Sequence, residues 1–198
     1  GKPEVGEGSA QESRDEISDA IRDANMIFIT AGMGGGTGTG AAPVVAEIAK
    51  DLGILTVAVV TKPFKFEGAK KMIQAEKGIS ELLKHVDSLI VIPNEKLISS
   101  DQKLTMRQSF SLADDVLKAG VKSISDLILN EGFINLDFAD VSTIMKDAGY
   151  AHMAIGNGTG KDKVTEATKQ VITSPLLETS IKGAKRLLVN IVASDDIL

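Results

Sequence analysis

The sequence predicts an α/β protein in which a parallel sheet is connected by crossover helices. Three apolar runs, at residues 26–31, 54–61 and 88–93, are rich in β-branched side chains and lack polar alternation, which is typical of strands buried on both faces. Stretches with helical spacing separate these runs. The resulting order of strand, helix, strand, helix, strand favours parallel strands joined by right-handed crossovers.

The segments between and before these strands carry helix signals. Residues 41–53 have Pro43 near the start and Gly53 at the end, which is the order expected of a helix. Residues 67–85 are expected to form the second crossover helix. Before the first strand, helical spacing is confined to residues 17–24, because residues 1–16 are rich in Gly, Ser and Glu.

The second half of the chain begins with a long helix. Residues 107–130 keep an apolar stripe at helical spacing, and at about 1.5 Å per residue this helix is long enough to join two subdomains. A further helix is expected within residues 137–150, with Asp137 at its N-cap. The remaining elements are expected to be a strand at 151–155, a glycine-rich turn, a helix at 162–172 and a strand at 186–193.

Composition excludes several classes of protein. A net charge of -5 and a pI of about 5.1 argue against nucleic-acid binding, which normally needs a clustered basic face. The absence of cysteine excludes disulfides and thiolate metal sites, and fits a reducing cytoplasm. Because no apolar run approaches the roughly 18 residues of a membrane helix, we expect a soluble protein without direct membrane insertion.

The stretch Gly32 to Gly40, GMGGGTGTG, is the strongest chemical signal in the sequence. It follows a strand and opens a helix, so its backbone amides and the positive helix end favour an anion such as phosphate. The alternative is a glycine-rich turn that only packs strand against helix. A P-loop would need Lys where Ala41 stands, and a dinucleotide fingerprint would need an acid where the second strand ends in Thr61, Lys62 and Pro63.

The flanked motif AGMGGGTGTGAAP resembles the phosphate loop of the tubulin and FtsZ family, in the form found in FtsZ. Further blocks that resemble the family follow in order along the chain: PEVG, TKPF with FEG, HVDSLIVIPN, DVL, NLDFADV, SPLLE and LVNI. The resemblance implies a tubulin-like GTP-binding domain within residues 1–106, a central connecting helix at 107–131, and part of an α+β, GTPase-activating C-terminal domain at 132–198.

Matching residues to the family's motifs implies a site for GTP or GDP. The residues that would hold the terminal phosphates are Gly34, Gly35, Gly36, Thr37, Gly38 and Thr39. Glu67 resembles a ribose-contacting glutamate, and Lys71 stands where the family often has an arginine. Asn94 and Asp115 resemble residues that read the guanine edge, and Phe110 resembles an aromatic that stacks on the base. A turn-forming Asn94 and a core Phe110 are the alternatives.

Acidic residues follow the long helix in the block INLDFAD. Asp137 and Asp140 suit an N-cap and a first-turn acid, and this structural role is expected in any case. The resemblance implies that Asn135, Asp137 and Asp140 enter the phosphate pocket of an adjacent subunit and polarise the attacking water, with Mg²⁺ balancing the phosphate charge. His85 and His152, without ligand spacing, are expected to be structural.

The resemblance also implies partners and a location. The family is a cytoplasmic division GTPase that assembles head to tail at the division site and contacts other division proteins through regions mostly outside this sequence. Because the family's first strand, an earlier glycine loop and most of the C-terminal domain have no counterpart here, we expect weak GTP binding and self-association through an open sheet edge. An interaction module that caps filaments remains the alternative function, and a nicotinamide-dependent oxidoreductase is disfavoured.

Overall fold

The computed structural model describes residues 1–98, 104–129, 137–177 and 183–193. It contains a four-stranded sheet in the order β1-β2-β3-β4, formed by β1 (Met26–Gly32), β2 (Leu55–Lys62), β3 (Ser88–Pro93) and β4 (Gly149–Ala151). All neighbouring strands are parallel. The predicted α/β class and the three predicted strands are confirmed.

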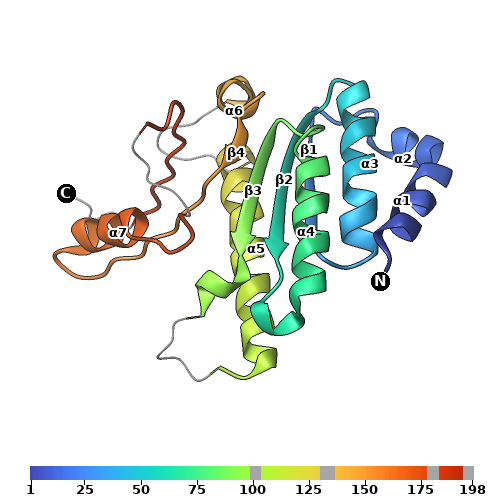
Figure 1. The fold of residues 1–198 in the computed structure, drawn as a ribbon. Helices are drawn as coiled ribbons and strands as arrows, with labels where there is room; N and C mark the ends of the chain where they lie inside the picture. Colours follow the sequence, from blue (N-terminus) through green and yellow to red (C-terminus); the bar gives the residue numbers. More distant parts are fainter. Residues whose placement is uncertain (99–103, 130–136, 178–182, 194–198) are drawn as a thin grey trace.

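Helices cover both faces of this sheet (Figure 1). On one face lie α3 (Thr37–Asp51) and α4 (Ala69–Leu82), which pack against Ala58 and Val60 of β2. On the other face lie α5 (Met106–Leu129) and α6 (Phe138–Met145), which pack against Val57 and Val59 of the same strand. Because alternate residues of a strand point to opposite faces, β2 is buried on both sides, as its unbroken apolar sequence predicts.

The first crossover helix begins earlier than predicted. α3 starts at Thr37, so Pro43 lies inside the helix and not at its first turn. The prediction of a start at residue 41 was wrong because the glycine motif itself forms the first helical turn. Pro43 lacks the N–H that would bond the carbonyl of Thr39, a loss confined to one bond of a helix that is largely buried.

The N-terminal segment is helical from residue 3 onward, whereas the sequence predicted helical spacing only at residues 17–24. It forms α1 (Pro3–Glu12) and α2 (Arg14–Ile21). Helix α1 packs closely on α3 through glycines, since a Cβ added to Gly6 would lie 2.5 Å from the carbonyl oxygen of Gly36. Because small residues form this interface, the spacing of large apolar side chains did not predict it.

Salt bridges and a small apolar cluster complete this N-terminal packing. Arg14 of α2 forms salt bridges with Glu47 at 3.2 Å and Asp51 at 2.8 Å, both on α3. Ala10 of α1 is buried against Val44 and Ile48 of α3. The two N-terminal helices are therefore fixed along the outer side of α3.

The C-terminal elements differ in part from the prediction. Helix α6 ends at Met145, and the last strand of the sheet lies at Gly149–Ala151, before most of the predicted strand at 151–155. Helix α7 (Lys163–Ile172) matches the prediction, but residues 186–193 do not form the expected strand. A strand needs a hydrogen-bonded neighbour, and the part of the chain that the structure describes offers none to this segment, where Leu187 is 75% and Ile191 76% exposed.

Candidate functional site

The carboxyl ends of β1, β2 and β3 meet at one edge of the sheet, at the bottom of Figure 1. Gly32 pairs with Thr61, and Lys62 pairs with Pro93, so the three following loops begin side by side. The loop after β2 contains η1 (Lys65–Glu67), and the chain after β3 forms η2 (Asn94–Leu97). Ligands of open α/β sheets bind at this edge.

The glycine loop has a defined shape held by one internal hydrogen bond. The Gly34 amide donates to the hydroxyl oxygen of Thr39 at 2.8 Å. Gly34 has a φ of 104°, and a Cβ placed on it would lie 2.7 Å from the carbonyl oxygen of Lys71, so only glycine fits this position.

The amides of Gly35, Gly36, Thr37 and Gly38 donate no hydrogen bond to the described residues. These groups lie at the first turn of α3, where helix amides have no intrahelical acceptor. Unpaired amides at a helix start attract anions. The loop therefore presents donors suited to phosphate oxygens.

The side chain of Thr39 faces into the loop. Its side chain is buried, at 4% exposure, and its oxygen accepts from Gly34 inside the loop. It lines a separate cavity on the other side of α3 and does not face the strand ends. Thr39 thus stabilises the loop's shape, while Thr37 is exposed at the start of the helix.

A cavity of about 270 Å³ opens beside the glycine loop at the strand ends. It brings together five of the predicted site residues from separate parts of the chain: Gly35, Glu67, Lys71, Asn94 and Phe110. Its volume is near the lower limit of about 300 Å³ for small-molecule sites. The predicted residues Gly36, Thr37 and Gly38 do not line the cavity.

Asp114, and not the predicted Asp115, faces this cavity. Asp114 lies four residues after Phe110 on α5, and residues four apart share one face of a helix. Asp115 is displaced by one residue around the helix and is exposed to solvent away from the cavity. The structure thus places Asp114 at the cavity and leaves the predicted Asp115 outside it; the i, i+4 spacing from Phe110 is the sequence signal that favours Asp114.

Asn94 provides a buried acceptor without a partner. The residue is 5% exposed, and its side-chain oxygen accepts no hydrogen bond from any described residue. Buried polar atoms are nearly always satisfied, so an orphaned oxygen at a cavity indicates a donor supplied by a ligand or by water. This oxygen fits a base edge that carries N–H groups.

Glu67 and Lys71 form an ion pair at the mouth of the cavity. The Lys71 ammonium lies 3.0 Å from one carboxylate oxygen of Glu67, and the other oxygen accepts from the Phe64 amide at 2.9 Å. Glu67 therefore already fixes the loop between β2 and α4. Its contact with a ribose stays a prediction.

Phe110 is held by two other aromatic rings. Phe64 meets it edge-on at 5.4 Å between ring centroids, and Phe66 does so at 5.9 Å. Phe64 is fully buried, while Phe110 keeps 40% of its surface exposed. Edge-to-face contacts of this kind fix a ring's orientation and leave part of Phe110 available for stacking.

The predicted acidic residues lie at the opposite end of the molecule. Asp137 is the N-cap of α6 and accepts a hydrogen bond from the Asp140 amide at 2.8 Å, while Asn135 lies outside the described residues. Figure 1 shows α6 beyond the amino ends of the strands, and α5 runs from the cavity toward it. The 24 residues of α5 span about 36 Å, so Asp137 and Asp140 cannot reach the glycine loop of their own chain.

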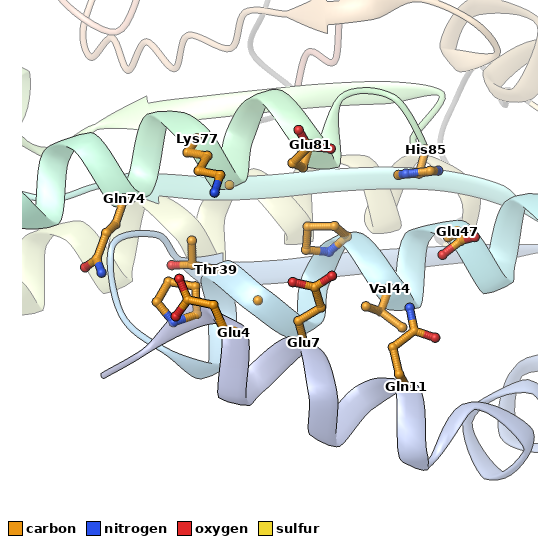
Figure 2. A pocket seen from close by; sticks show the side chains of 14 residues that line it. Glu4, Glu7, Gln11, Thr39, Val44, Glu47, Gln74, Lys77, Glu81 and His85 are labelled. Carbon is orange, nitrogen blue, oxygen red and sulfur yellow. The ribbon is translucent and has the colours of Figure 1, made fainter.

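A larger cavity, of about 350 Å³, lies between α1, α3 and α4 (Figure 2). Carboxylates of Glu4, Glu7 and Glu81 line it, and these repel phosphate. The Lys84 ammonium, which donates to both oxygens of Glu81 at 2.9 and 2.7 Å, holds the pKa of that carboxyl below its ordinary value. This cavity is away from the strand ends and is not the candidate site.

The described residues contain neither a metal-binding cluster nor a membrane-spanning helix. No group of three or more histidine, cysteine, aspartate or glutamate side chains is arranged to hold a metal ion within the described ranges. Likewise, none of the helices in those ranges is long and apolar enough to cross a membrane.

Three features meet at the carboxyl edge of this parallel sheet: a glycine loop with unpaired amides, an exposed aromatic ring and a buried amide acceptor. This combination is typical of nucleotide-binding α/β proteins. Comparison with known families supports this class. The model of the tubulin/FtsZ family GTPase domain matches residues 1–102, and that of the FtsZ family C-terminal domain matches residues 149–198. The chain belongs to the tubulin/FtsZ family.

Solved structures agree with this assignment. An FtsZ dimer in its empty form from M. jannaschii is 48% identical, with a TM-score of 0.87 over 89% of this chain and 52% of its own. An FtsZ mutant from the same organism is also 48% identical, with a TM-score of 0.87 over 90% and 54%. CetZ from Methanosaeta thermophila shares the fold at 19% identity, with a TM-score of 0.69 over 86% and 49%. The chain spans about half the length of these relatives.

Proposed function

We propose that this chain belongs to a guanine-nucleotide hydrolase of bacterial cell division that assembles head to tail in the cytoplasm. The observation that carries the proposal is the cavity at the strand ends. There the unpaired oxygen of Asn94 lies in the same cavity as Gly35, whose loop presents free backbone amides. The family match indicates that the nucleotide is GTP, since the matching domain is a GTPase domain.

Different residues of the site contact different parts of the nucleotide. Backbone amides of the loop from Gly35 to Gly38 bind phosphate oxygens, and the start of α3 favours their negative charge. Phe110 stacks on the base. Asp114 accepts hydrogen bonds from the guanine N1 and N2 hydrogens, and the Asn94 oxygen accepts a further one. Adenine has no N2 amino group and no N1 hydrogen, so these acceptors disfavour it.

Hydrolysis requires a second copy of the chain. Because α5, which spans about 36 Å, separates the acids of α6 from the cavity of their own chain, these acids serve the loop of a neighbour in a head-to-tail contact. Carboxylates of Asp140 and Asp137 orient water for attack on the terminal phosphorus. The bond to the bridging oxygen breaks, GDP and inorganic phosphate leave, and the water proton passes to a carboxylate.

Mg²⁺, when bound, neutralises part of the phosphate charge. The ion would need few ligands from the protein, because Mg²⁺ at such sites is held largely by substrate phosphates and water. Lys71, near the cavity mouth, adds a positive charge on the same side as the phosphates.

Self-association fits the relatives, since one of the matching FtsZ structures is described as a dimer. An alternative, in which the chain is an interaction module that only caps filaments, would use the acids of α6 without turnover. The chain has both a formed cavity and unpaired loop amides, and these favour the hydrolase function over the interaction module.

Nucleotide selectivity tests the proposal directly. In the full-length protein we expect GDP to bind at least about 100-fold more tightly than ADP, because adenine would leave the Asp114 carboxylate and the buried Asn94 oxygen unpaired. Equilibrium titration with both nucleotides measures this ratio. Equal affinity for the two, or binding of neither, would contradict the proposed function.

A further inference from the structure

Hydrogen bonds from two distant parts of the chain converge on the C-terminal end of α6. The hydroxyl of Ser88, the first residue of β3, donates to the Met145 carbonyl oxygen at 2.7 Å. The Arg186 guanidinium donates through Nη1 to the carbonyl oxygens of Ile144, at 3.1 Å, and of Lys146, at 2.6 Å. Three successive carbonyls at the helix end are thus satisfied by side chains from outside the helix.

The chain that leaves α6 is fixed by Asp87, the residue before β3. One carboxylate oxygen of Asp87 accepts from the Asp147 amide at 3.3 Å, and the other accepts from the Thr56 amide at 2.9 Å. Its backbone oxygen accepts from the Gly149 amide at 2.9 Å. Asp147 takes a φ of 50°, the left-handed conformation that turns the chain from α6 into β4.

These contacts hold the helix firmly. The last carbonyls of a helix have no intrahelical donor, so Ser88 and Arg186 supply bonds that the helix itself cannot make. Arg186 also places a positive charge at the negative end of the helix dipole. Ser88 is completely buried, and its hydrogen bond to Met145 is therefore stronger than one in water.

The other end of α6 carries Asp137 and Asp140. The helix has eight residues and is about 12 Å long, so a tilt of about 5° at the held end would displace the acids by about 1 Å. A displacement of that size in a catalytic arrangement costs up to about 10²-fold in rate.

We propose that Arg186 and Ser88 are positioning residues that set the direction in which α6 presents its acids to a second copy of the chain. Ser88 lies within the part that matches the GTPase domain and Arg186 within the part that matches the C-terminal domain. The contacts therefore couple both domains to the acid-bearing helix that lies between them. This inference rests on the proposed function, because the acids have a target only if the neighbouring chain binds GTP.

The test replaces the Arg186 donors in the full-length protein. Arg186→Met keeps much of the side-chain length and loses both hydrogen bonds and the charge. We expect kcat for GTP hydrolysis to fall roughly ten-fold with KM and GDP affinity unchanged, and Arg186→Lys, which keeps a donor and the charge, to recover part of the loss. Lys185→Met is the matched control, since Lys185 makes no hydrogen bond with the described residues, and it should leave kcat unchanged.

Hydrogen exchange separates the outcomes. Amides of α6 should exchange faster in Arg186→Met and in Ser88→Ala, while those of α4 should not change. If the unmodified protein hydrolyses no GTP, the proposed function fails, and the inference fails with it even if α6 exchanges faster. If the unmodified protein is active, the inference alone is overturned when both variants keep full kcat, or when kcat falls only together with GDP affinity.

Discussion

In the proposed site, single residues decide which base the cavity accepts. Asp114 lines the cavity and Asp115 does not, so the two neighbouring carboxylates form a matched pair for substitution. We expect Asp114→Ala to weaken GDP binding by about 2 kcal/mol, roughly thirty-fold, because it removes a charged acceptor from the guanine edge. Asp115→Ala should change the affinity less than about two-fold, since surface changes away from a site have small effects. Calorimetric titration of GDP measures both, and the reverse order would contradict the assignment of Asp114.

Asp114→Asn gives a second, chemically different check on the same residue. An amide nitrogen donates where the carboxylate accepted, and xanthine carries a carbonyl where guanine carries its amino group. The variant should therefore lose affinity for GDP and gain affinity for xanthosine diphosphate in parallel titrations. A loss of affinity for both nucleotides would show that Asp114 supports the fold of the cavity and does not read the base.

Sequence patterns at the residue scale located most of the site but not the direction of its side chains. The loop motif, Asn94 and Phe110 stand directly after strands or on a helix with clear spacing, so their meeting in one cavity was predictable from topology. Thr39 and Asp115 were assigned by motif position alone. Which way a side chain points from a loop or helix depends on the packing of its neighbours, and Thr39 turned inward to accept from Gly34.

At the scale of elements, the glycine loop is stabilised by its contact with the start of α4. Gly34→Ala would place a Cβ 2.7 Å from the Lys71 carbonyl oxygen and would force alanine into a φ of 104°. We expect it to lower the free energy of unfolding by about 2 kcal/mol. Gly35→Ala is the control, because a Cβ there has nothing within 4 Å, and its stability should change by less than about 0.5 kcal/mol. Urea denaturation compares the two, and equal stability would refute the contact.

Helices and strands with a strong apolar pattern were predicted well, whereas elements that depend on small residues or on a hydrogen-bonded neighbour were not. The three predicted strands and the long helix α5 follow directly from side-chain spacing, although β1 at the sheet edge is only partly buried. Helix α1 was missed because Gly6 and Ala10 allow close packing without large side chains. The strand expected at residues 186–193 has an apolar sequence, yet a strand also requires a hydrogen-bonded neighbour, which sequence spacing does not report.

At the scale of the whole molecule, the separation of pocket and acids predicts that neither can act without a second copy. Asp140→Ala keeps an intact cavity, and Asp114→Ala keeps intact acids on α6. At GTP concentrations well below the weakened Kd of Asp114→Ala, each variant alone should have little GTPase activity. In an equal mixture, a head-to-tail contact is complete when the Asp140→Ala subunit supplies the cavity and the Asp114→Ala subunit supplies the acids. Random assembly makes about a quarter of all contacts complete in this way.

Turnover in the mixture should therefore rise to about a quarter of that of the unmodified protein per subunit, measured by phosphate release at assembling concentration. A protein carrying both substitutions is the control, because adding it to either single variant completes no contact. If the acids acted within their own chain, the mixture would show only the mean of the two separate activities. The distance of about 36 Å along α5 makes that outcome incompatible with the structure, so a mixture without gain would mean that the acids of α6 take no part in hydrolysis.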